Sequence, residues 1–288
     1  MRKNTTYAVL AFLFLTPLLH SMDWPSVSLI MTRNFGWNDR GMPHLGINFE
    51  HDGAIAAADD GELLFHRKKT ETASRLPSPL GNWTALDHGD GIVSIYARLD
   101  DKMPETAAMA EKGRVLGEAG ISGWSSVRGF YFQLFDRREK RWINPSLLIS
   151  PPEDTRLPEI LTVRLKDAQG NLFNPNQLLN LNQGRYTIII NAIDTMRFSY
   201  ERPLAPHRII CLLNGSEAGA LIFETYSARD GQLMVYRNGL VPVRQVYGSV
   251  PAYEIADVWF SRGQANLEII AQDITGNTRN VIYRFPVE

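Results

Sequence analysis

The residues best placed to do chemistry lie in His44-Leu45-Gly46-Ile47-Asn48. A histidine followed at short spacing by an oxygen-bearing side chain is typical of zinc hydrolases, in which imidazole and carboxylate groups hold the metal that activates water. Asn48 offers a neutral amide oxygen instead of a carboxylate, and an amide is a weak zinc ligand. The stretch therefore resembles the first half of a zinc-hydrolase site with one ligand altered.

Other reactive groups lack the surroundings that their chemistry requires. The single cysteine, Cys211, lies in the apolar run RIICLLN, where we expect a small buried side chain and not a reactive thiol. No serine has a G-x-S-x-G context, and no phosphate-binding loop or dinucleotide fingerprint is present. The net charge of −1 gives no electrostatic basis for binding nucleic acid.

The elements that must position these residues are short strands. Between residues 22 and 152, apolar and β-branched runs alternate with turns rich in Gly, Asp and Asn. Only the segment 103–113 has a composition that favours a helix. Pro151 and Pro152 end this region, and residues 153–288 hold seven or eight further strand candidates, a density typical of a β-sandwich. The sequence thus predicts an all-β protein of two domains, 22–152 and 153–288.

The N-terminus has the pattern of a signal peptide. Arg2 and Lys3 precede the apolar run Tyr7–Leu19, which is too short to span a bilayer comfortably. We therefore predict a signal peptide over residues 1–21, no integral span after its removal, and an exported protein of the periplasm or cell envelope.

The order of phrases in the first domain resembles the LytM/lysostaphin-type zinc metallopeptidases (duplicated-hybrid-motif fold), which cleave peptide cross-links of bacterial cell walls. These phrases are FGWNDRGMPHLGINFE (35–50), AIAAADDGELL (54–64), LDHGDGIVSIYARL (86–99), KGRVLGEAGISGWSS (112–126), GFYFQLFD (129–136) and RWINP (141–145). The resemblance covers roughly residues 30–149.

The resemblance implies five functional positions, of which this sequence keeps one. The zinc-ligand positions fall on His44, Asn48 and Tyr131, and the positions that handle water and the oxyanion fall on Arg98 and Gly129. An arginine stays protonated and repels a metal ion, and a glycine has no group for acid–base work. We therefore expect no catalytic residues, no bound metal and no cofactor, with His44, Asn48 and Tyr131 as vestigial ligand positions and Arg98 and Gly129 as vestigial catalytic positions.

The altered positions can still line a binding groove formed by His44, Asn48, Arg98 and Tyr131. Arg98 could accept a carboxylate or an amide-rich peptide, or it could pair with Asp100 or Asp101 on a solvated strand end. His44 could bond to a ligand in the groove or be satisfied by neighbouring polar groups.

Two further features concern the surface and the second domain. Trp83 and Trp124 lie in polar, glycine-containing surroundings and are the tryptophans best suited to the surface. Asp273-Ile-Thr-Gly-Asn277 resembles the turn before the last strand of bacterial immunoglobulin-like domains, although the Cys-Trp-Cys signature of antibody domains is absent.

The function expected from these observations is non-catalytic. The protein would be an exported, inactive homologue of the LytM-type peptidases that binds cell-wall peptide (peptidoglycan) or regulates a cell-wall hydrolase. Two alternatives stay open: an active zinc metalloendopeptidase with non-standard ligands, for which zinc would be the cofactor, and a structural envelope protein.

Overall fold

The computed structural model describes the chain except for residues 1–20, 69–77, 105–106, 197–201 and 249–251. All but the last residue of the predicted signal peptide lie outside the described residues. The described part contains strands and three 3-10 helices of three residues each, so the all-β prediction is confirmed. No helix in this part of the chain has the length and apolar character needed to cross a membrane.

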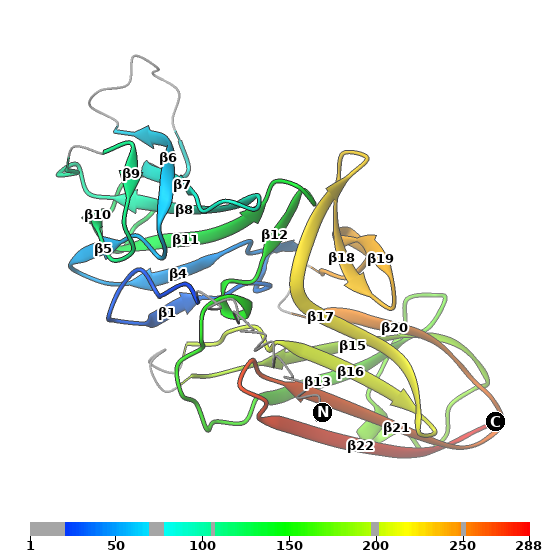
Figure 1. Cartoon of the computed structure of the whole chain (residues 1–288). Helices are drawn as coiled ribbons and strands as arrows, with labels where there is room; N and C mark the ends of the chain where they lie inside the picture. The colour runs from blue at the N-terminus through cyan, green and yellow to red at the C-terminus, as the bar shows by residue number, and fades with distance from the viewer. Residues whose placement is uncertain (1–20, 69–77, 105–106, 197–201, 249–251) are drawn as a thin grey trace, which may run out of the picture.

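The first region is built from short strands around one central strand, β11 (Figure 1). Its strands are β1 (Ile30–Arg33), β2 (Asn38–Asp39), β3 (Met42–Pro43), β4 (Ile47–Glu50), β5 (Ala54–Ala56), β6 (Gly61–Arg67), β7 (Asn82–Asp87), β8 (Ile92–Leu99), β9 (Met109–Ala110), β10 (Val115–Glu118), β11 (Gly129–Asp136) and β12 (Arg141–Ile143), followed by the 3-10 helix η1 (Pro145–Leu147). The expectation of a helix over 103–113 is wrong for the described residues, because Met109–Ala110 pair with β6 as the short strand β9.

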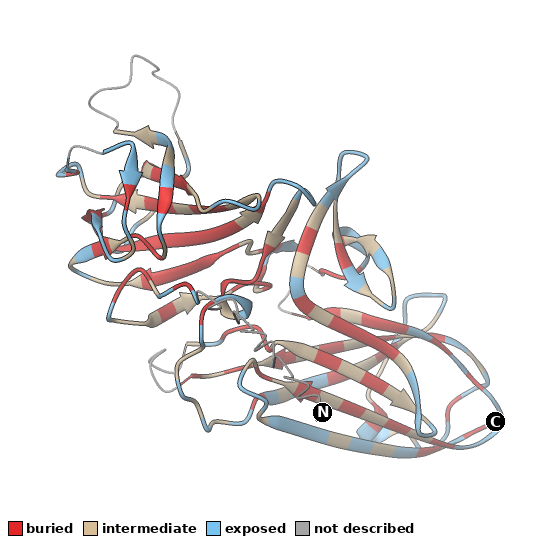
Figure 2. Ribbon diagram, viewed as in Figure 1, coloured by how far each residue is buried: buried red, intermediate tan, exposed pale blue. Residues whose placement is uncertain are grey.

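β11 is almost wholly buried because both of its edges are paired and both of its faces are covered (Figure 2). It pairs with β8 on one side and with β4 and β12 on the other, always antiparallel. Its largely apolar sequence, GFYFQLFD, is typical of a central strand rather than a half-exposed one.

The second region forms two antiparallel sheets that enclose a core. Its elements are β13 (Glu159–Lys166), β14 (Leu172–Phe173), η2 (Pro175–Gln177), β15 (Gly184–Ile193), β16 (Arg208–Leu213), β17 (Ser216–Arg229), β18 (Gln232–Arg237), β19 (Leu240–Pro242), η3 (Val243–Gln245), β20 (Tyr253–Phe260), β21 (Gly263–Gln272) and β22 (Thr278–Val287). One sheet has the order β14-β13-β15-β20 and the facing strands run β22-β21-β16-β17. This arrangement fits the predicted immunoglobulin-like sandwich, which stays a prediction.

The two regions share a sheet and exchange core residues. β12 pairs with the long strand β17, with Trp142 opposite Tyr226, so the hydrogen-bonded sheet continues from one region into the other. Phe35 packs into the core of the second region, and Leu204 packs into that of the first. The domain boundary at 152–153 therefore stays a prediction, and the contacts between the regions are extensive. Cys211 is fully buried in the second core, as predicted.

Three carboxylates meet near the junction of the two regions. One oxygen from each of Asp154, Asp194 and Asp273 lies within 4.8 Å of the others. Asp194 is only 4% exposed. Burial, together with the charges of Asp273 and Asp154, raises its pKa to about 7. The unfolded chain has the ordinary aspartate value of 3.8, so the folded state retains the proton and loses stability as pH rises from about 4 to about 7.

We predict that Asp194→Asn stabilises the protein at pH 8 and has little effect at pH 4.5. A difference of about 3 between folded and unfolded pKa values corresponds to roughly 4 kcal/mol, so even a partial release of this penalty should raise the Tm by about 4 °C or more at pH 8. Thermal denaturation of both proteins in the presence of a chelator measures the effect. Equal Tm differences at the two pH values would contradict it.

Candidate functional site

The five positions singled out in the sequence converge at one end of β11. Asn48 on β4 lies directly opposite Tyr131 on β11, and Tyr131 lies opposite Ala97, the neighbour of Arg98 on β8. His44 precedes β4, and its backbone N–H donates to the carbonyl of Trp37 (2.9 Å). The side chains that share this region therefore come from three adjacent strands and one loop.

Two glycines let the backbones approach closely at this end. A Cβ on Gly46 would lie 2.4 Å from the carbonyl oxygen of Phe132 and 2.7 Å from the ring of Tyr131. A Cβ on Gly129 would lie 2.0 Å from the carbonyl oxygen of Phe49. No side chain fits at either position unless the backbone moves, so position 129 cannot hold a histidine in this register.

Tyr131 is the centre of the side-chain contacts. Its ring meets the ring of His44 edge to face, with 5.4 Å between centroids, and the guanidinium carbon of Arg98 lies 5.8 Å from the same ring centroid. A cation at this distance from a tyrosine face is stabilised by the ring quadrupole. Burial raises the pKa of Tyr131 well above its ordinary value, so its hydroxyl stays protonated and cannot serve as an anionic metal ligand.

His44 is held in its neutral form. Burial is the largest cause that lowers its pKa, and the positive charges of Arg98 and Arg33 lower it further, to about 4. Among the described residues, no hydrogen-bond partner meets its buried Nε2 or the buried Oδ1 of Asn48, although the neighbouring Asn48 side chain opposes the lowering of the His44 pKa. These two atoms occupy the positions of two expected zinc ligands and stay unsatisfied in the structure.

Arg98 occupies an irregular position in β8. Asn82 and Trp83 pair with Leu99 and Ala97, so Arg98 is the extra residue of a bulge, and its φ of 66° lies in the left-handed region. Such a conformation is uncommon for arginine and changes the direction in which its side chain leaves the strand.

Arg98 does not pair with the nearby acids named as its alternative partners. Asp100 lies 3.3 Å from the guanidinium of Arg128, and Asp101 accepts from the side chain of Asn82 at 2.8 Å. Nε of Arg98 is buried without a hydrogen-bond partner. Within the part of the chain that the structure describes, the charge of Arg98 therefore has the Tyr131 ring beside it and no carboxylate.

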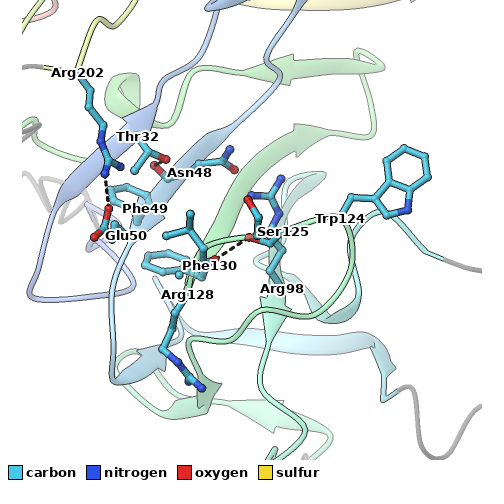
Figure 3. Close-up of a pocket in the computed structure, with 13 residues that line it drawn as sticks. Thr32, Asn48, Phe49, Glu50, Arg98, Trp124, Ser125, Arg128, Phe130 and Arg202 are labelled. Carbon is cyan, nitrogen blue, oxygen red and sulfur yellow. Dashed lines mark hydrogen bonds and ion pairs between the residues drawn. The ribbon is translucent and has the colours of Figure 1, made fainter.

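A cavity of about 160 Å³ lies beside these residues. Asn48 and Arg98 extend toward it, while Trp124 lies at its edge and points outward (Figure 3). His44 and Tyr131 do not line it: next to it, Tyr131 is buried and His44 is half-buried. The remaining wall is formed by Thr32, Phe49, Glu50, Ser125, Ser126, Val127, Arg128, Gly129, Phe130 and Arg202.

The donor set does not fit a catalytic zinc ion. Of the three ligands that such a site needs, only the imidazole of His44 is kept. The amide of Asn48 and the protonated phenol of Tyr131 take the other two positions, and the permanently charged Arg98 lies next to them. Among the described residues, the grouping of three or more His, Cys, Asp or Glu side chains with ligand spacing is the Asp154–Asp194–Asp273 cluster, which does not include His44.

Comparison with known proteins places this region in a family. The model of peptidase family M23 matches residues 42–145, which contain all five positions. Residues 42–145 are a peptidase family M23 domain. The resemblance to LytM-type peptidases drawn from the sequence is therefore confirmed, and a second β domain follows the M23 domain. A second family model matches residues 157–288.

Individual relatives of the M23 domain are distant. An uncharacterized protein of Treponema pallidum (strain Nichols) is 28% identical over 126 residues, which cover 40% of this chain and 86% of that protein. The catalytic domain of the prophage-encoded M23 protein EnpA of Enterococcus faecalis is 17% identical over 43% of this chain and 95% of its own, with a TM-score of 0.35. A zinc-containing peptidase of Vibrio cholerae is 18% identical over 44% of this chain and 39% of its own, also with a TM-score of 0.35.

The structure adds a part of the site that the sequence did not indicate. The loop between β10 and β11 supplies the residues from Trp124 to Arg128, and of these only Trp124 was singled out, as a surface tryptophan. It is 73% exposed, whereas Trp83 is half-buried and packs against Phe65 with ring centroids 4.6 Å apart. The glycine- and serine-rich sequence of this loop, GISGWSSVRG, was the available signal.

We predict that His44 of the M23 domain titrates near pH 4. NMR signals of its imidazole, followed from pH 7 to pH 3.5, measure this midpoint. Replacement of Arg98 by Met should raise the midpoint, because a neighbouring positive charge that disfavours imidazolium is removed. Arg138→Met is the matched control, since Arg138 is exposed and pairs with Asp90. A midpoint near 6.5 in the native chain would show that the ring is solvated or carries a ligand.

Proposed function

We propose that the M23 domain of this protein is a non-catalytic binding domain that takes cell-wall peptide in the groove beside β11, and that the protein is exported to the periplasm or cell envelope. The single observation that carries this proposal is Arg98, whose charge lies at a catalytic position of the family, faces the cavity and has no carboxylate partner among the residues that the structure describes. An M23 domain supplies the fold of a groove shaped for peptides, and its altered residues supply a different chemistry.

The other altered positions support the loss of catalysis. Hydrolysis of a peptide bond by this family type requires an activated water and a group that moves its proton. His44 alone among the five positions keeps a metal-binding group, and Gly129 has no space for a replacement side chain. An active zinc metalloendopeptidase with non-standard ligands is therefore the less favoured function.

We predict that the purified protein contains less than about 0.1 zinc per chain, because one imidazole is too few ligands to hold the ion. The variant Asn48→Asp/Arg98→His/Tyr131→His should bind about one zinc, because it adds a carboxylate and an imidazole to His44 at the three ligand positions and replaces the neighbouring arginine with a neutral side chain. Metal analysis after dialysis against zinc measures both values. Stoichiometric zinc in the native protein that is lost in His44→Ala would overturn the proposal and restore the peptidase function.

We also predict that the full chain sediments with purified peptidoglycan and that His44→Ala/Arg98→Ala reduces the bound fraction severalfold, since hydrogen bonds to a charged group contribute on the order of 2 kcal/mol. Arg138→Ala should bind as the native chain does. Binding that ignores the groove substitutions would favour the structural envelope role. A protein that binds no peptidoglycan but is captured by a cell-wall hydrolase would favour the regulatory role.

A further inference from the structure

Among the described residues that line the cavity beside β11, one guanidinium has no carboxylate to compensate its charge. Arg202 pairs with Glu50 at 2.7 Å, and Arg128 pairs with Asp100 and donates to the carbonyl of Ala119. Arg98, among the described residues that line the cavity, has neither a carboxylate nor a carbonyl partner. A partly buried cation without a counter-ion is a strong site for an anion, because water solvates it only in part.

The neighbouring polar group favours a planar, hydrogen-bonding anion. Asn48 is 7% exposed and its side chain extends into the cavity on the same side as Arg98 (Figure 3). The amide N–H of Asn48 can donate to a ligand oxygen that also accepts a hydrogen bond from the guanidinium of Arg98. Arginine binds carboxylates through two parallel N–H donors, which suits a carboxylate better than a monatomic ion.

The size of the cavity limits what accompanies the anion. A volume of about 160 Å³ is smaller than the pockets of roughly 300 Å³ or more that enclose drug-sized ligands. It accommodates the end of a chain, meaning one carboxylate with a small side chain, and it does not enclose a sugar ring with its neighbours.

Two exposed apolar side chains lie in the loop that forms one wall of the cavity. Trp124 is 73% exposed and Val127 is 52% exposed, and both belong to the loop that forms the cavity wall. Exposed aromatic and branched side chains beside a charged cavity offer a surface for the apolar atoms of a residue that stays outside it.

We propose that this cavity binds the terminal α-carboxylate of a peptide, with Arg98 and Asn48 holding the carboxylate and Trp124 covering the residue that precedes it. This assignment rests on the proposed peptide-binding function of the groove and specifies which part of the peptide is recognised. A peptide that ends in a small residue fits best, because the cavity leaves little room beyond the carboxylate.

The test compares two probes on the purified full chain, N-acetyl-Lys-D-Ala-D-Ala and the same tripeptide with its C-terminus amidated. Calorimetric titration should show binding of the free acid and at least about tenfold weaker binding of the amide, as expected for the loss of a charged hydrogen-bonded pair. Arg98→Gln should weaken binding of the acid by a similar factor, and Arg98→Lys should restore part of it by keeping the charge. Trp124→Ala should weaken both probes, and Arg138→Gln should change neither.

The outcomes separate this inference from the function on which it rests. A chain that sediments with peptidoglycan but binds acid and amide equally overturns the terminal-carboxylate site and leaves the peptide-binding function standing. A chain that binds neither probe nor peptidoglycan overturns both. Competition of the free acid by inorganic phosphate at equal concentration would show a general anion site and would also overturn the assignment. Arg98→Lys keeps the test valid if Arg98→Gln disturbs the bulge, and circular dichroism checks the fold of each variant.

Discussion

The pairing of β4 with β11 is the constraint on which the rest of the site depends. This register places Asn48 opposite Tyr131 and brings the backbone of β4 so close to Gly129 that no Cβ fits there. The backbone at Gly46 lies equally close to β11, and this places the loop that carries His44 against the ring of Tyr131. The pairing of β4 with β11 thus keeps the family's site positions together, and it also leaves no space for a catalytic side chain at position 129.

In the proposed function, Arg98 makes the retained groove a site for an anion in place of a cation. Its charge lowers the pKa of His44, which stays neutral, and within the described part of the chain it lies over the ring of Tyr131 and not against an acid. A partly buried charge without a partner costs stability, as does its left-handed backbone conformation. The unpaired charge and the left-handed backbone of Arg98 both cost stability at a residue that lines a cavity, which favours a ligand that offsets these costs.

The sequence predicted the strands and the order of the motifs because these depend on local patterns of apolar residues and turns. It left the partner of Arg98 open, because that depends on a bulge between β7 and β8 and on Arg128, which reaches Asp100 from another loop. It did not predict that Phe35 belongs to the core of the second region, since an apolar residue gives no sign of which core it enters. The helical composition of 103–113 was overridden by pairing along β6.

The second region does more than follow the M23 domain, because it holds the segment from which His44 projects. The hydroxyl of Tyr247 donates to the carbonyl of Gly36 at 2.8 Å, and the side-chain amide of Asn38 donates to the carbonyl of Gly248 at 3.1 Å. Gly36 in turn donates its N–H to the carbonyl of His44 at 2.9 Å. Together with the pairing of β12 and β17, these bonds hold the segment that precedes β4, and with it one side of the groove, against the second region. A groove fixed in this way loses little conformational entropy when a ligand enters, which favours recognition of one small group over adaptation to many.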